Sequence, residues 1–331
     1  MSITSPRRRR IVLGTVGAIA VPPWSVGLAR AATYPGSQPV RLIVPGPPGG
    51  SSDVGARLLV GGMTQQLKGT IFVENLAGAA GTIGTARTAR AEPDGYTIGL
   101  GFATSHTIAP STIKNLPYDP VRDFTPIGRS FTLKLCVIAN PSFPAANLRE
   151  LIALARKPDS NVMYGGWGYG STSHLTMESI NNYAGLKMGM VPYKGEAPIV
   201  QAVLGGEIGL AIATVGVALP HIKAGKLKVL GICSRKRSVM LPEMPTFAEQ
   251  GVPFDLVAWQ ALFAPARTPA AIVQQLATAL QETLKSRELL DRAEAVGMEY
   301  DPISREDFSR QLKEEIATWA KLARAAGVKP E

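Results

Sequence analysis

Short apolar runs alternate with longer amphipathic stretches along the chain from Val40 onward. Apolar runs predict strands over residues 40–44, 70–74, 96–101, 131–139, 162–164, 210–214 and 227–233. Helical spacing of apolar residues predicts helices over residues 54–67, 83–90, 173–183, 199–204, 272–286, 287–296 and 305–326. Strands that alternate with helices in this order are typical of parallel sheets covered by helices on both faces. We therefore predict an α/β protein with two lobes.

Composition supports a folded chain and argues against metal chemistry. The 331 residues are 45% hydrophobic and 18% charged, which is enough apolar material to bury a core. Two cysteines and three widely spaced histidines offer neither a disulfide scaffold nor a zinc cluster. We expect no metal and no cofactor, and the sequence leaves open whether Cys136 pairs with Cys233.

Residues 1–31 have the three parts of an export signal: four consecutive arginines (residues 7–10), an apolar run (residues 11–21) and a small-x-small site at residues 29–31. The eleven apolar residues reach about 16 Å as a helix, half of a bilayer core of about 30 Å, so they do not span a membrane. The arginines fit either a twin-arginine signal or an arginine-rich general secretory signal, and both remain open. We expect cleavage near Ala31 and a soluble mature protein in a bacterial periplasm.

The net charge of +10 is concentrated at the N-terminus. Residues 1–31 hold five arginines and no acid, which leaves 30 basic against 25 acidic side chains in the rest of the chain. A net charge of +5 without a basic stripe does not indicate nucleic-acid binding.

Two glycine-rich loops lie between a predicted strand and a predicted helix. The first holds Gly49, Gly50, Ser51, Ser52 and Asp53, and the second is the segment YGGWGYGSTSH at residues 164–174. Glycines let a backbone approach a ligand closely, and free amides at a helix start favour an anion. Either loop alone is equally consistent with a helix cap that binds nothing. Because the two occupy equivalent places in two α/β units, we predict a clamp for a carboxylate.

Neither loop carries a catalytic or nucleotide-binding motif. In the second loop Ser171 stands where G-x-G-x-x-G needs its last glycine, and no G-x-x-x-x-G-K-[ST] occurs in the chain. Ser171 and His174 keep an exported serine hydrolase open as an alternative, although no G-x-S-x-G surrounds the serine.

Seven motifs follow one another in a fixed order along the chain. They are PGPPGGSSDVGAR (45–57), ENLAGAAGTIG (74–84), AEPDGYT (91–97), YGGWGYGSTSHL (164–175), VPYKGEAP (191–198), IKAGKLKVL (222–230) and LPEMPTFAEQG (241–251). This series resembles the extracytoplasmic solute receptors of tripartite tricarboxylate transporters, often called the Bug family, over essentially the whole mature chain.

The resemblance implies a type II periplasmic-binding-protein fold that closes on a small carboxylated solute and presents it to membrane permease subunits, with the receptor as a monomer and not an enzyme. Its crossing strands would lie near residues 133–139 and 259–264, with lobe 1 at 33–133 and 263–331 and lobe 2 at 134–262. The implied ligand contacts are Gly49, Gly50, Ser51, Ser52, Asp53, Thr104, Ser105 and His106 in lobe 1, and Gly168, Gly170, Ser171, Thr172, His174, Tyr193, Lys194 and Gly195 in lobe 2.

Three features of the chain bear on the solute. The family pattern G-G-x-x-D ends here in Gly209, so we expect altered handling of amino or hydroxyl groups if the usual acid faces the cleft. Trp167 and Tyr169 are expected to narrow the pocket or to stack on an aromatic acid. The identity of the solute stays open, as does the choice between transport and sensing for a membrane signalling partner.

Overall fold

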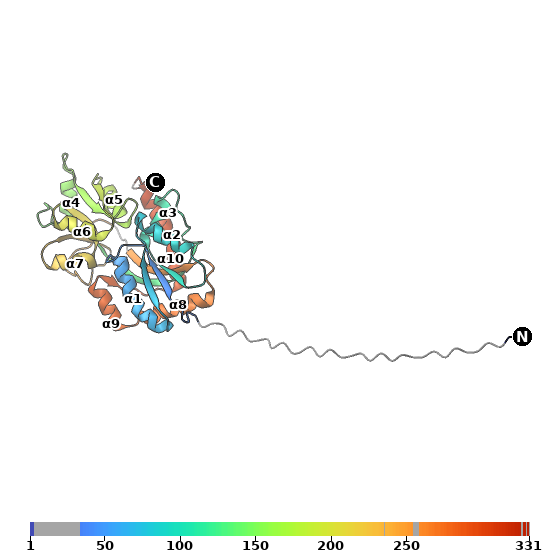
Figure 1. The fold of residues 1–331 in the computed structure, drawn as a ribbon. Coiled ribbons are helices and arrows are strands. Elements are labelled where there is room, and N and C mark those ends of the chain that lie inside the picture. The colour runs from blue at the N-terminus through green and yellow to red at the C-terminus, as the bar shows by residue number, and fades with distance from the viewer. Residues whose placement is uncertain (3–33, 235, 254–257, 326, 329, 331) are drawn as a thin grey trace. The chain divides into compact units, whose positions relative to one another are not determined.

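The computed structural model describes residues 1–2, 34–234, 236–253, 258–325, 327–328 and 330 (Figure 1). The predicted export signal lies outside the described residues apart from Met1 and Ser2. Residues 34–331 form one compact unit that is built on two sheets. None of the helices in the described part of the chain combines the length and the apolarity needed to cross a bilayer.

The first sheet has six strands and combines the two ends of the mature chain. Its strands, in order across the sheet, are β11 (Met298–Glu299), β4 (Phe124–Leu133), β10 (Ala258–Pro265), β3 (Thr97–Phe102), β1 (Val40–Val44) and β2 (Ile71–Asn75). Strand β1 is parallel to β2 and β3, whereas β10 is antiparallel to β3 and β4.

The second sheet repeats this arrangement with five strands. In order they are β7 (Gly189–Pro192), β6 (Met163–Gly166), β8 (Leu210–Thr214), β5 (Leu135–Ala139) and β9 (Lys228–Cys233). Strand β6 is parallel to β7 and β8, and β5 is antiparallel to β8 and β9. The short strand β11 is antiparallel to β4. The first strand after each crossing, β5 in the second sheet and β10 in the first, lies antiparallel between two neighbouring strands. This exchange of strands confirms the predicted periplasmic-binding-protein architecture.

Helices cover both faces of the first sheet. The first-lobe helices are α1 (Ser51–Leu67), η1 (Ala79–Gly81), α2 (Thr82–Ala89), η2 (Thr104–Ile108), α3 (Ala109–Thr112), α8 (Ala270–Thr283), α9 (Arg287–Ala295) and α10 (Arg305–Ala325). Helices α1, α8 and α9 share one hydrophobic core with the sheet, and α2 and α10 share the other. Strand β10 serves both cores because its side chains alternate: Leu262 lies in one and Phe263 in the other.

The second sheet is covered in the same way. Its helices are α4 (Leu148–Ala155), α5 (Thr172–Ala184), α6 (Glu196–Leu204) and α7 (Val215–Lys223). Residues of α4 and α5 lie in one core, and those of α6 and α7 lie in the other. Figure 1 shows these four helices, in green and yellow, at the upper left of the molecule, with α1, α8 and α9 below them.

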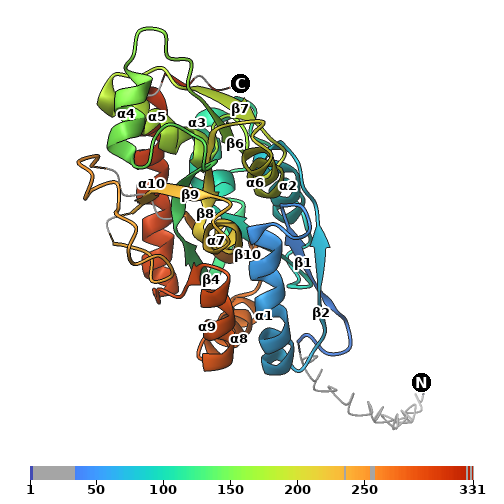
Figure 2. The same ribbon diagram turned by 90° about the vertical axis from the view of Figure 1, so that its left-hand side faces the viewer.

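Three segments join the lobes. Strand β4 of the first sheet ends at Leu133 and β5 of the second sheet begins at Leu135. The first crossing between the lobes therefore consists of one residue, Lys134. The second crossing lies between β9 and β10, and all of β10 pairs in the first sheet, starting with Ala258 opposite Leu133. The division expected between residues 262 and 263 therefore falls inside a strand of the first sheet. Helix α10 packs against β4 and also against α5, and its Trp319 lies in a second-lobe core (Figure 2).

Strand register places the two cysteines on opposite faces of the second sheet. Cys233 of β9 pairs with Leu135 of β5, whereas Cys136 pairs with Ile232. Cys136 and Cys233 accordingly belong to different hydrophobic cores, and both are buried free thiols. Burial raises the pKa of each thiol.

The lobes also touch through two glycines on either side of their interface. Gly216 lies near the start of α7, and Gly297 lies in the turn between α9 and β11 with a φ of +78°. A Cβ atom built on Gly216 would lie 1.6 Å from the carbonyl oxygen of Val296. No side chain fits there unless the two lobes separate.

We predict that Gly216→Ala destabilises the folded protein by about 2 kcal/mol, a typical cost of overpacking. The matched control is Gly61→Ala in α1, where an added Cβ meets nothing within 4 Å. Because alanine is the better helix former, that control should gain about 1 kcal/mol. Urea unfolding followed by tryptophan fluorescence measures both changes. Equal stability of the two variants would show that the glycine contact is absent in solution.

Candidate functional site

A cavity of about 860 Å³ lies between the two sheets. Its first-lobe wall comes from the segments after β1, β2 and β3, and its second-lobe wall comes from those after β6, β7 and β8. Leu133 and Leu135 line it beside the first crossing, and Trp259 and Gln260 of β10 line it near the second. The cavity is therefore built from both lobes and both crossings.

Five α-helices of the described chain begin at this cavity. The lining residues at their starts are Ser51 (α1), Gly81 (α2), Thr172 (α5), Glu196 (α6) and Thr214 (α7). The first amides of a helix have no partner within the helix and carry partial positive charge. Five such ends around one cavity make it a favourable place for an anion without a buried cation.

The first loop is held in shape by Asp53. Its carboxylate accepts a hydrogen bond from the Gly49 amide at 2.9 Å and pairs with Arg57 at 3.0 Å. Burial raises the pKa of Asp53, but the hydrogen bonds from Arg57 and Gly49 outweigh burial and lower it. Gly49 has a φ of +76°, which favours glycine. Asp53 and Gly49 thus shape the loop and do not line the cavity.

The segment 77–81 after β2 also lines the cavity, and sequence reasoning did not select it as part of the site. Gly78, Ala79, Ala80 and Gly81 are consecutive residues with positive φ. Alanines are uncommon in this left-handed region, and such strain concentrates at functional sites. The signal in the sequence was the glycine spacing of the motif ENLAGAAGTIG.

The structure brings nine of the sixteen predicted contacts to the cavity wall. They are Gly50, Ser51, Ser52, Thr104, Gly168, Thr172, Tyr193, Lys194 and Gly195. The other seven do not line it: Gly49, Asp53, Ser105, His106, Gly170, Ser171 and His174. Thr104 and Thr172 meet across the lobes, with their hydroxyl oxygens 2.8 Å apart.

His106 lies behind the cavity wall. Its ring stacks on Phe263 with centroids 4.1 Å apart, and Phe124 packs against it at 4.9 Å. Nδ1 shares a hydrogen bond with the Ser105 hydroxyl at 3.0 Å, while Nε2 has no partner. Burial lowers the pKa of His106 to about 3, so the imidazole is neutral at pH 7.

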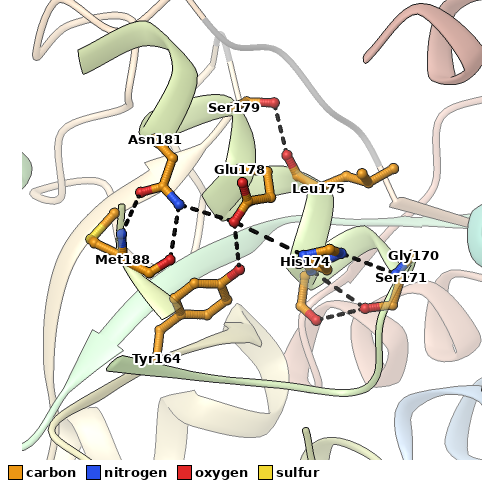
Figure 3. A network of polar contacts seen from close by, with 10 residues as sticks. Tyr164, Gly170, Ser171, His174, Leu175, Glu178, Ser179, Asn181 and Met188 are labelled. Carbon is orange, nitrogen blue, oxygen red and sulfur yellow. Dashed lines mark hydrogen bonds and ion pairs between the residues drawn. The ribbon is translucent and has the colours of Figure 1, made fainter. Parts of the chain in front are cut away.

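Ser171 and His174 support the second loop and are not paired as a nucleophile and a base. The Ser171 hydroxyl caps α5 by accepting from the His174 amide, and it shares a hydrogen bond of 2.9 Å with Ser173 (Figure 3). His174 Nδ1 accepts from the Gly170 amide at 3.0 Å, and Nε2 lies 3.9 Å from Glu178. The imidazole thus stabilises the second loop through its bond to Gly170. Burial lowers the pKa of His174. This geometry argues against the hydrolase alternative.

Two charged side chains line the cavity among the described residues, Lys194 and Glu196. Lys194 is exposed, whereas Glu196 is only 9% exposed and accepts a hydrogen bond from the Thr214 amide. Burial raises the pKa of Glu196, and hydrogen bonds from Thr214 and Ser51 oppose that rise. Sequence reasoning missed Glu196, although it directly follows Gly195 in VPYKGEAP.

Gly209 lies away from the cavity, so the absence of the usual acid at this position gives no reason to expect altered ligand choice. Gly209 directly precedes β8, at the end of that strand away from the cavity-lining Thr214, and an added Cβ would meet the Phe143 ring at 2.6 Å. Trp167 lines the cavity as expected. Tyr169 does not, because it is 58% exposed and packs edge-on against His174.

The family of tripartite tricarboxylate transporter receptors matches residues 55–328. The chain belongs to this family. Protein BugT of Bordetella pertussis (strain Tohama I) is similar, with 34% identity over 322 residues that cover 96% of each chain. The resemblance found in the seven ordered motifs is thereby confirmed.

Solved structures of relatives share the fold. The periplasmic binding protein BugD has a TM-score of 0.83 at 34% identity, covering 88% of this chain and 99% of its own. A protein of R. palustris solved with adipate has a TM-score of 0.85 at 31% identity, covering 90% of this chain and 100% of its own. MatC from Rhodopseudomonas palustris with bound malate has a TM-score of 0.80 at 30% identity, covering 86% and 98%.

These comparisons set the class of the protein. It is a solute-binding receptor of a family of periplasmic binding proteins, and it is not an enzyme. Among the residues the structure describes, no three His, Cys, Asp or Glu side chains gather in a group that could hold a metal ion.

The buried His106 predicts how stability depends on pH. Its pKa in the folded protein is about 3, below the usual 6.5, so the unfolded chain takes up the proton first as pH falls. The contribution to stability is complete above pH 6.5 and decreases as pH falls toward 3, by about 1.4 kcal/mol per pH unit. Urea unfolding of the wild type and of His106→Leu between pH 7 and 5 should show a shallower slope for the variant. Parallel curves would contradict a buried neutral imidazole.

Proposed function

We propose that the protein captures a small carboxylated organic solute between its lobes and delivers it to the permease subunits of a tripartite tricarboxylate-type transporter. The observation that carries the proposal is the convergence of five helix starts on one cavity between the lobes. Backbone amides at these helix starts, the hydroxyl of Ser52 and the one hydroxyl hydrogen that the Thr104–Thr172 pair leaves over supply donors to a carboxylate there. Adipate and malate in related structures support this class of ligand.

Capture depends on contact with both lobes at once. A solute that touches only one lobe binds the open and closed forms equally and shifts nothing, whereas one that bridges the cavity favours the closed form. The cavity has hydroxyl groups on both walls, with Ser52 on the first lobe and Thr172 on the second. The closed shape is then the form that the permease recognises, and the receptor acts as a monomer.

A thermal-shift screen over small mono- and dicarboxylic acids tests the capture step. A ligand that binds only the folded protein, at 100 times its dissociation constant, adds about 2.7 kcal/mol to stability and raises the melting temperature. Ser52→Ala should weaken binding of that acid about tenfold, because one hydrogen bond to a charged group is lost; Ser51 is not used for this test because its hydroxyl donates to Glu196. Ser171→Ala should lower the stability of the ligand-free protein by about 1 kcal/mol through loss of a helix cap. A response to sugars or cations, with none to any acid, would refute carboxylate capture.

Delivery is tested in the host bacterium. We propose that residues 1–31 direct export and are removed near Ala31, so that the mature receptor meets the permease in the periplasm. Deleting the gene for this chain should abolish uptake of the identified acid at low concentration, measured with a radiolabelled solute. Normal uptake, together with loss of a transcriptional response to that acid, would replace transport with the sensing alternative.

A further inference from the structure

Within the described part of the chain, the cavity is lined by one carboxyl group, that of Glu196, which a site that binds only an anion does not need. It belongs to the first residue of α6 on the second lobe, and its carboxyl accepts from the backbone amide of Thr214 at the start of α7. The Ser51 side chain of the first lobe also lies within hydrogen-bonding range of it. Ser51, Glu196 and Thr214 all line the cavity.

Glu196 has acceptor capacity beyond these contacts. A carboxylate offers about four lone-pair positions and no donor when ionised. The bonds from Thr214 and Ser51 use part of that capacity, and the remainder faces a site where the other described lining residues contribute one further charge, Lys194. An ionised Glu196 cancels the charge of Lys194, and this balance suits a ligand with one carboxylate and one donor group.

We propose that Glu196 makes this receptor select acids that carry a hydroxyl, amide or ammonium group in addition to one carboxylate, and that it disfavours fully ionised dicarboxylates. The inference rests on the proposed function, since it assumes that the carboxylate of the ligand meets the helix starts. The donor group of the ligand then hydrogen-bonds to Glu196, whereas a second carboxylate meets a like charge at the ionised Glu196.

A series of six-carbon acids isolates the end group. Hexanoate, 6-hydroxyhexanoate, 6-aminohexanoate and adipate have the same chain length and one carboxylate in common. Isothermal titration of the purified mature protein at pH 7.5 should give at least about tenfold tighter binding for 6-aminohexanoate than for adipate, with 6-hydroxyhexanoate above hexanoate.

The variant Glu196→Gln keeps the shape of the side chain and removes its charge. We expect the affinity for 6-aminohexanoate relative to that for adipate to fall about tenfold in this variant. Adipate should bind more tightly because a repelling charge is removed, and 6-aminohexanoate should bind more weakly because its ammonium group loses an anionic partner. The control is Glu243→Gln, an exposed glutamate of the second-lobe chain outside the cavity, which makes the same change in net charge and should keep the wild-type ratio. If Glu196→Gln fails to fold, the order of affinities of the four acids for the wild-type protein tests the inference by itself.

The outcomes separate this inference from the proposed function. Adipate binding as tightly as 6-aminohexanoate to the wild type would overturn the inference and leave carboxylate capture intact. An equal change for all four acids in Glu196→Gln would also overturn it, because Glu196 would then only tie the lobes together. No binding within the series, with a response to another acid in the thermal screen, overturns the inference alone. No response to any acid overturns both.

Discussion

The proposed capture of a carboxylate depends on one physical constraint, which is to hold an anion out of water without a buried cation. Desolvating a carboxylate is costly unless donors are already oriented toward it. The α/β topology supplies such donors because each parallel strand leads into a helix at the same edge of its sheet. Five of these junctions meet at one cavity, and their orientation is fixed by the sheets. Loop residues such as Asp53 and Ser171 serve this arrangement by holding the helix starts in place.

The same topology explains how two rigid halves can act as one receptor. Each sheet contains one antiparallel strand that follows a crossing, so both lobes are fixed to the connections between them. Helix α10 packs on both lobes, and Gly216 allows close contact on the side of α7. A cavity formed jointly by two such lobes responds to a ligand that bridges them. Under the proposed function, this geometry couples solute binding to the closure of the lobes.

Selectivity among carboxylates has a different origin from affinity for them. Backbone amides at helix starts recognise any anion of suitable size. The side chains between them decide what else the ligand must carry, and here those side chains are mostly apolar, with Lys194 exposed and Glu196 buried. A buried acid beside an anion site is tolerated because Thr214 and Ser51 hydrogen-bond to it. Under the two proposals, the receptor combines a general anion clamp with a side chain that discriminates between end groups.

The sequence by itself determined the alternation of strands and helices, the family and the two glycine-rich loops. The predicted strands over 40–44 and 210–214 have the bounds of β1 and β8, because a buried parallel strand is a continuous apolar run bounded by turns. Helices α4 and α7 and strand β7 were not predicted, and the apolar run over 131–139 proved to be parts of two strands in different sheets. Local pattern does not reveal the sheet a strand joins, since pairing involves residues far apart in the chain. For the same reason only the tertiary structure placed His106 and Gly209 away from the cavity and brought Glu196 opposite Ser51.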